Sequence, residues 1–88
     1  MSTLVAKLDN KLTLTPNIGF LVYPNPANNF VNVLINDYAF TELYNICGKK
    51  ILLTHENLIY LNNFSQGIYI LKIYDNKGQI SIQKIIHI

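Results

Sequence analysis

The chain has 88 residues, half of them hydrophobic, and a formal net charge of +2 at pH 7. This length suits a single domain with one modest core, and it excludes a two-domain enzyme with an interdomain cleft. All seven basic residues are lysines, and arginine, which makes the best bidentate contacts with phosphate and guanine, is absent. Because the lysines also form no continuous basic stripe, we expect no nucleic-acid partner.

Simple features of the sequence exclude further classes. Cys47 is the only cysteine, so neither an internal disulfide nor a cysteine-rich zinc site can form. No apolar run reaches the length of a membrane-spanning helix, and we expect no membrane insertion. Residues 1–7 lack the basic region and the apolar stretch of a secretory signal, so any export signal would belong to a longer precursor.

The first 19 residues differ from the rest of the chain. Leu8, Leu12 and Leu14 alternate only weakly with polar residues, and Pro16 and Gly19 then interrupt the pattern. We expect residues 1–19 to be a linker or an extra edge strand, and residues 20–88 to form the folded domain.

From residue 20 onward, apolar residues alternate with a period of two, and β-branched and aromatic residues are frequent. This pattern predicts seven strands, near residues 20–23, 30–36, 39–46, 50–55, 58–61, 68–74 and 79–87. Seven short strands separated by turn residues favour an all-β fold, an antiparallel β-sandwich. The strand near 68–74 is apolar at both parities, so we expect it to lie centrally and to be covered on both faces.

Two turns share one sequence pattern. Tyr44 and Tyr74 are each followed by Asn or Asp, and a glycine (Gly48 or Gly78) comes three residues after that. An Asn or Asp side chain can bond the turn backbone, while glycine adopts the left-handed conformation that closes a bulged turn. The repeat therefore predicts two similar tight hairpins between antiparallel strands.

The side chains that could carry chemistry are scattered. His55 and His87 have no further His, Cys or carboxylate at ligand spacing, so we expect two surface histidines. Cys47 has no base beside it and is expected to be inert. Three of the five acidic residues lie at or near predicted turns, where carboxylates cap the backbone. The sequence thus predicts no catalytic residue, no metal site and no cofactor.

The Pro-Asn-Pro segment, Pro24 to Pro26, carries more information. Each proline forces the residue before it out of the helical region, so the segment should be rigid and extended. It directly follows the apolar run of residues 20–23. Two interpretations remain open from these residues alone, a stiff exit from a strand or a presented recognition element.

A set of motifs distributed over the chain points to a family. In order along the sequence these are Val22-Tyr23-Pro24-Asn25-Pro26-Ala27, Asn29-Phe30-Val31-Asn32-Val33, Leu43-Tyr44-Asn45 followed by Gly48-Lys49, Phe64-Ser65-Gln66-Gly67-Ile68-Tyr69, and Lys84-Ile85-Ile86. In this order they resemble the type A C-terminal sorting domains of the type IX secretion system of Bacteroidota. The resemblance covers about residues 20–88.

This resemblance implies an immunoglobulin-like sandwich of seven strands and a non-catalytic role. Such a domain is a sorting signal at the C-terminus of a cargo protein, which it directs from the periplasm across the outer membrane. The implied partners are the translocon and its shuttle proteins, a cell-surface sortase-like protease that usually cleaves the signal, and the N-terminal cargo domain. The implied location is the cell surface or the medium, in association with the outer membrane.

Carried over by position, the resemblance assigns sorting or recognition to ten residues. They are Pro24, Asn25, Pro26, Gly48, Lys49, Gly67, Tyr69, Lys84, Ile85 and Ile86. We further hypothesise that the rigid segment of residues 24–26 and the terminal strand around residues 84–86 form part of the recognised surface. An accessible edge strand could pair with a translocon or shuttle partner by strand addition. The sequence departs from the family at Cys47, where a small polar residue is more usual, and at its end, where a basic terminus is frequent.

Two other functions are compatible with a small sandwich. Exposed tyrosines and asparagines would suit a surface module that binds carbohydrate or protein, and three coplanar exposed aromatic rings would favour it. An enzyme would need polar groups that converge in a pocket. Of the three functions, the sequence favours a sorting signal most, a binding module second and an enzyme least.

Overall fold

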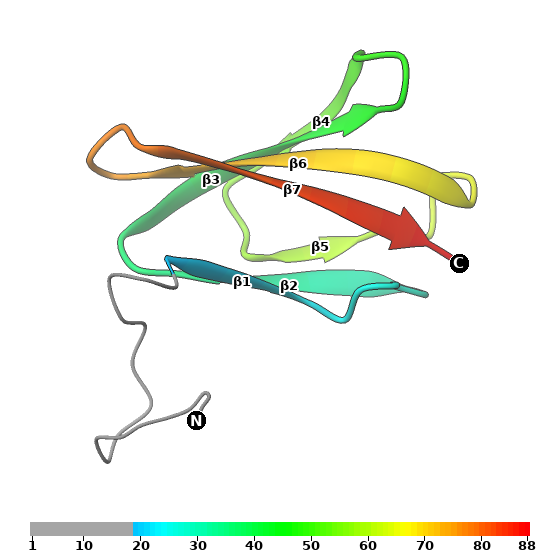
Figure 1. The fold of residues 1–88 in the computed structure, drawn as a ribbon, viewed down its shortest axis with the longest axis horizontal. Coiled ribbons are helices and arrows are strands. Elements are labelled where there is room, and N and C mark those ends of the chain that lie inside the picture. Colours follow the sequence, from blue (N-terminus) through cyan, green and yellow to red (C-terminus); the bar gives the residue numbers. More distant parts are fainter. Residues whose placement is uncertain (1–18) are drawn as a thin grey trace.

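A computed structural model describes residues 19–88 and shows two antiparallel β-sheets that face each other (Figure 1). The strands are β1 (Phe20–Tyr23), β2 (Phe30–Ile35), β3 (Tyr38–Asn45), β4 (Lys50–Thr54), β5 (Leu58–Tyr60), β6 (Gly67–Asp75) and β7 (Ile80–His87). A three-stranded sheet has the order β1-β2-β5, and a four-stranded sheet has the order β4-β3-β6-β7. The predicted all-β sandwich is confirmed, and every predicted strand agrees with an observed one.

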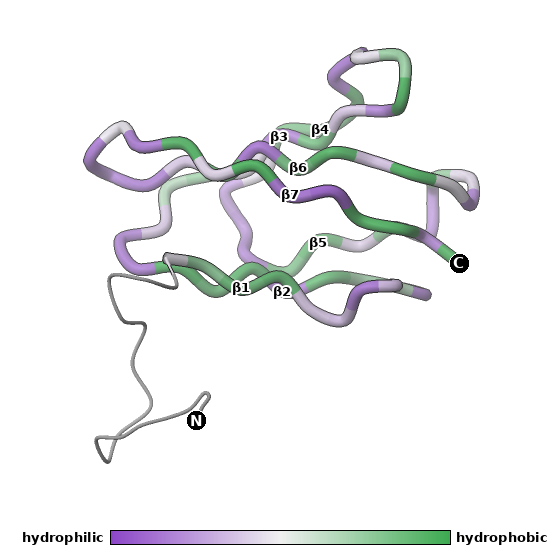
Figure 2. The backbone as a smooth tube through the Cα atoms, viewed as in Figure 1, coloured by the Kyte–Doolittle hydropathy of each residue, from purple (hydrophilic) through white to green (hydrophobic). Residues whose placement is uncertain are grey.

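The core lies between the two sheets and is built from alternate residues of each strand (Figure 2). Side chains at every second position of a strand point to the same face, so a period-two apolar pattern buries one side of each sheet. On β6, for example, Tyr69, Leu71 and Ile73 point inward. The other buried hydrophobic residues are Val22, Ala27, Val31, Val33, Leu43, Ile59, Leu61 and Ile85.

The two predicted hairpins have the same hydrogen bonds. At the β3–β4 turn, Asn45 Oδ1 accepts from the backbone N–H groups of Cys47 and Lys49, both at 3.0 Å. At the β6–β7 turn, Asp75 Oδ1 accepts from the backbone N–H groups of Lys77 and Gln79, both at 2.9 Å. Each turn ends at a glycine three residues later, with φ of 86° and 83°. The shared sequence pattern therefore encodes one turn geometry, used twice.

The position of β6 confirms one expectation and corrects another. β6 lies between β3 and β7, so it is central, as its apolar sequence predicts. Its outer face is not covered by a second layer within residues 19–88, because Ile68 is 40% exposed there. Alternation identifies a strand with two apolar faces, but it does not say what covers each face. The outer face of the four-stranded sheet thus carries apolar residues that the core does not use.

Strand β7 shows a related difference. The isoleucines that share one parity, including Ile80, Ile82 and Ile86, are exposed, while Ile85 and His87 of the opposite parity are buried. The core therefore takes the less apolar side of β7. The reason is the pairing of β7 with β6, because Ile85 lies opposite the core residue Tyr69 and must share its face.

Candidate recognition surface

The Pro-Asn-Pro segment lies beside the C-terminal end of β7, 60 residues away in the sequence (Figure 1). The backbone bends at residues 24–26, so the segment is not extended as the prolines predict. Both X–Pro peptide bonds are cis. Ala27 directly follows and forms an isolated parallel bridge with His87. The structure thus brings together two of the sequence-predicted elements, residues 24–26 and residues 84–86.

Asn25 and Ala27 hold the free edge of β7. Asn25 Nδ2 donates to the Lys84 carbonyl at 3.0 Å, and its Oδ1 accepts from the Ile86 N–H at 3.0 Å. Ala27 donates to the Ile86 carbonyl at 2.7 Å and accepts from the Ile88 N–H at 2.8 Å. We call these four contacts the edge clamp. While the clamp is closed, strand addition at residues 84–88 is blocked, because the backbone groups that a new strand would need are already bonded.

His87 is part of the same junction and is not a surface histidine. It is only 7% exposed, and its ring nitrogens lie 3.3 Å from the Ala27 carbonyl and 3.2 Å from the Phe64 carbonyl. The prediction of a surface position is therefore wrong for His87, because β7 turns this parity toward the core. His55 is exposed, as predicted, and its ring packs against Phe40 with 5.8 Å between centroids.

The late motif has a structural role. Tyr69 is 6% exposed, and its hydroxyl donates to the carbonyl of Ser65, four residues upstream. A tyrosine near the start of this strand, bonded back to the preceding backbone, is the tyrosine corner of immunoglobulin-like sandwiches. Gly67 has φ of 150°, in the region that favours glycine. Together with the fully buried Ile85, Tyr69 is inaccessible to a partner while the domain stays folded.

Gly48 and Lys49 lie elsewhere, at the exposed tip of the β3–β4 hairpin. No hydrogen bond or strand pairing within residues 19–88 connects them to the Pro-Asn-Pro segment. The exposed members of the ten predicted residues therefore form two separate groups. The first consists of Pro24, Asn25, Pro26, Lys84 and Ile86, and the second consists of Gly48 and Lys49.

Glu42 is a buried carboxylate with three polar partners, and no sequence motif pointed to it. It lies on the outer side of the four-stranded sheet and is only 8% exposed. The hydroxyls of Tyr44 and Tyr74 both donate to Oε1 at 2.8 Å, and Lys50 Nζ lies 3.1 Å from Oε2. The hydrogen bonds from Tyr44 and Tyr74 are the main causes that lower the pKa of Glu42 to about 2. The same bond to Glu42 raises the pKa of Tyr44.

This arrangement stabilises the ionised form of a carboxylate. A general acid or base needs a pKa near the working pH, whereas the tyrosines and Lys50 keep Glu42 ionised. Glu42 and Tyr44 are two residues apart on β3, so the sequence alone could have shown that they share a face. Tyr74 belongs to the neighbouring strand β6, and only the strand pairing brings it to Glu42.

Residues 19–88 contain no group of three or more His, Cys, Asp or Glu side chains that could hold a metal ion. In the same residues, no helix is long and apolar enough to cross a membrane.

Comparison with known proteins gives two findings. Residues 21–88 match the family described as "Secretion system C-terminal sorting domain". The chain is also 34% identical over 67 residues to Beta-agarase D of Zobellia galactanivorans. The aligned residues cover 74% of this chain and 14% of the agarase. The chain therefore spans about a seventh of the length of this relative, and the similarity concerns one small part of it.

Proposed function

Since the chain belongs to the secretion system C-terminal sorting domain family and is thus a sorting signal for type IX secretion, we propose that its recognition surface is the junction between residues 24–26 and residues 84–86. The cargo of such a signal is secreted or displayed at the cell surface. The observation that carries the proposal is the edge clamp, which joins the first and the last motif of the family into one exposed surface.

Seven of the ten predicted residues have one of three roles under this proposal. Pro24, Pro26, Lys84 and Ile86 present accessible groups to a partner, while Asn25 fixes the geometry between them. Tyr69 and Ile85 contribute through the fold, because they are buried. A surface that depends on two distant segments exists only in the folded domain, so the machinery would recognise a folded signal.

The route and the partners form a further part of the proposal. The signal directs its cargo from the periplasm through the outer-membrane translocon with the help of shuttle proteins. A sortase-like protease at the cell surface then removes it from the cargo. We place the cleavage within or before residues 1–19, which lie almost entirely outside the described residues. Residues 20–88 form the recognised domain.

The sorting-domain family is non-catalytic in general, and we propose that this chain catalyses no reaction either. The support is geometric, because Cys47, His55 and His87 lie on a hairpin tip, an exposed loop and a buried strand end. None of them faces another within hydrogen-bond reach in residues 19–88. A carbohydrate-binding module is less favoured, because the exposed rings of Phe30 and Tyr60 meet at 72° and form no flat platform.

Reporter export tests the proposal directly. The complete chain is fused to the C-terminus of a periplasmic reporter protein in a Bacteroidota host with type IX secretion. We expect the reporter to reach the cell surface or the medium, and we expect truncation after Lys84 to abolish export, because it removes Ile86 and opens the edge clamp. A reporter that stays in the periplasm with the complete chain attached would contradict the proposal.

A further inference from the structure

The outer face of the four-stranded sheet has an unused apolar surface. Leu53, Ile68, Ile80, Ile82 and Ile86 are all exposed there, and Ile82 is 61% exposed. In Figure 2 hydrophobic positions recur along β6 and β7, although no second layer of residues 19–88 lies above them. Leu53, on β4, is separated from Ile82 by Glu42 and Lys72, so the exposed isoleucines gather on the neighbouring strands β6 and β7. Exposed apolar residues gathered in this way mark interaction sites.

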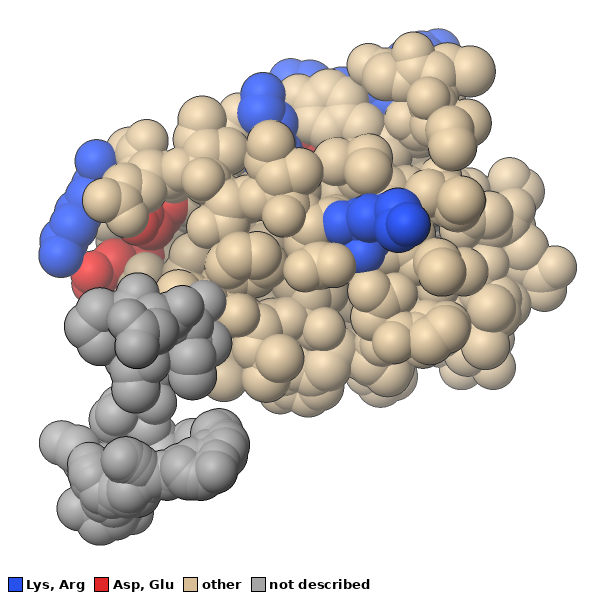
Figure 3. Space-filling view, viewed as in Figure 1, with Lys and Arg blue, Asp and Glu red and all other residues tan. Residues whose placement is uncertain are grey.

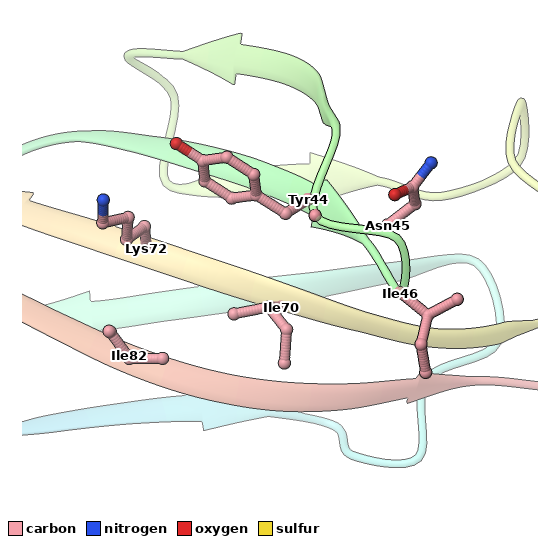
Figure 4. A pocket seen from close by; sticks show the side chains of 7 residues that line it. Tyr44, Asn45, Ile46, Ile70, Lys72 and Ile82 are labelled. Atoms are coloured by element: carbon pink, nitrogen blue, oxygen red, sulfur yellow. The ribbon is translucent and has the colours of Figure 1, made fainter.

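A shallow pocket lies on this face beside the β3–β4 hairpin (Figure 4). Ile70 of β6 and Ile82 of β7 form its floor, and Tyr44 and Ile46 stand at its sides. Its volume is about 300 Å³, and Asn45, Gly48 and Lys72 complete the lining. This volume is at the lower end of the range for small-molecule sites and would accept one large apolar side chain. The pocket therefore offers an anchor point within a broader surface.

The charges around the pocket are unbalanced. Glu42 on this face is already paired with Lys50 and accepts hydrogen bonds from the hydroxyls of Tyr44 and Tyr74. Lys72 lies over the Tyr44 ring, with Nζ 5.7 Å from the centroid. Neither Lys72 nor Lys84 has a carboxylate within ion-pair distance among residues 19–88. Figure 3 shows lysines over the four-stranded sheet and acidic atoms mainly at the end near the β6–β7 turn. The face is therefore apolar with a cationic border.

We propose that this pocket binds an acidic segment of a protein of the secretion machinery, with one apolar side chain between Ile70 and Ile82 and a carboxylate at Lys72. The inference rests on the proposed sorting function, and it adds a second contact surface on the face that Lys84 and Ile86 share. Charge complementarity selects the occupant. A second copy of the chain would bring Lys72 and Lys84 close to the same lysines, which costs energy.

Two pairs of matched variants test the pocket in the reporter fusion of the complete chain. Lys72→Glu and Ile82→Glu change the pocket, whereas Lys77→Glu changes a lysine of the β6–β7 turn and Leu21→Glu changes an apolar residue of β1 that is 48% exposed. Leu21, Lys77 and Ile82 are exposed and Lys72 is half-buried. Protease resistance of the periplasmic fusion verifies that each variant folds. We expect at least a tenfold loss of export for the two pocket variants, and less than a twofold change for the controls.

The outcomes separate the two proposals. If the unchanged fusion is not exported, the sorting proposal itself fails. If the unchanged fusion is exported and both pocket variants are exported equally well, or if the controls lose as much export as the pocket variants, the pocket inference fails while the sorting proposal stands. Lys72→Arg, which keeps the positive charge, should be exported as well as the unchanged fusion, in contrast to Lys72→Glu.

A photo-crosslinking amino acid at Ile82 identifies the class of occupant. The inference expects an adduct with a secretion-machinery protein, in which the linked peptide contains Asp or Glu, and expects Lys72→Glu to remove the adduct. An adduct with lipid, an adduct with a second copy of the chain, or no adduct during active export would each overturn it.

Discussion

At the scale of single residues, the sandwich uses polar side chains to fix its backbone. Asn25 bonds the edge of β7, Tyr69 bonds the backbone before β6, and Glu42 connects three donors on the outer side of the four-stranded sheet. Tyr69 and Glu42 are buried, and because their polar atoms are paired, their burial costs little. The bonds to Glu42 also lower its pKa strongly.

The pKa of Glu42 makes a prediction about stability and pH. The pKa falls from an ordinary value of 4.5 to about 2 in the folded domain. Folding therefore favours the ionised form, and this contribution is complete above pH 4.5 and disappears as the pH falls towards 2. The free energy of unfolding, measured in urea between pH 7 and pH 2.5, should fall across this range.

The variant Glu42→Gln isolates this contribution. It keeps the shape but loses the charge-assisted bonds, so we expect a loss of about 1–3 kcal/mol at pH 7 and a smaller loss of stability in acid. Glu56→Gln is the control, because Glu56 is exposed. Equal acid dependence in Glu42→Gln and the unchanged chain would contradict the assignment.

At the scale of elements, the edge clamp makes a local prediction. Asn25→Ala removes two of its four hydrogen bonds, so we expect a loss of about 1–2 kcal/mol and faster hydrogen exchange at the Ile86 amide. Amides of β3, which is paired on both sides, are the internal control. Unchanged protection at Ile86 would show that Asn25 does not hold the strand.

The two hairpins provide a matched comparison. Asp75→Asn should change the stability by less than about 0.5 kcal/mol, because Asn45 accepts the same two bonds at the other turn. Asp75→Ala leaves both turn N–H groups without this acceptor and should cost about 1–2 kcal/mol. Thermal unfolding of the two variants distinguishes these results. A loss in Asp75→Asn as large as in Asp75→Ala would mean that the carboxylate charge is required.

The sequence predicts elements of this size well, for identifiable reasons. The period-two pattern determines the strands, and the turn chemistry of Asn45 and Asp75 determines the hairpins. It does not predict which side of a strand faces the core when both sides are apolar or both are mixed. For this reason the burial of His87 and the exposure of Ile82 were not predicted, since they follow from the pairing of β7 with β6.

At the scale of the whole molecule, the fold joins segments that are distant in the sequence. The Pro-Asn-Pro segment meets the end of β7, and the β3–β4 hairpin borders a pocket whose floor comes from β6 and β7. Residue patterns predict the sandwich, and the family resemblance assigns recognition to ten motif residues, but only the tertiary structure shows which of them are exposed. Tyr69 and Ile85 are conspicuous in the sequence and buried in the fold.

We propose that the folded unit of residues 20–88 carries the sorting information. The most direct measurement compares export of one reporter fused to the complete chain, to residues 20–88, or to residues 1–19. We expect equal export with the complete chain and with residues 20–88, and no export with residues 1–19. Export that requires residues 1–19, or that occurs with them alone, would contradict it.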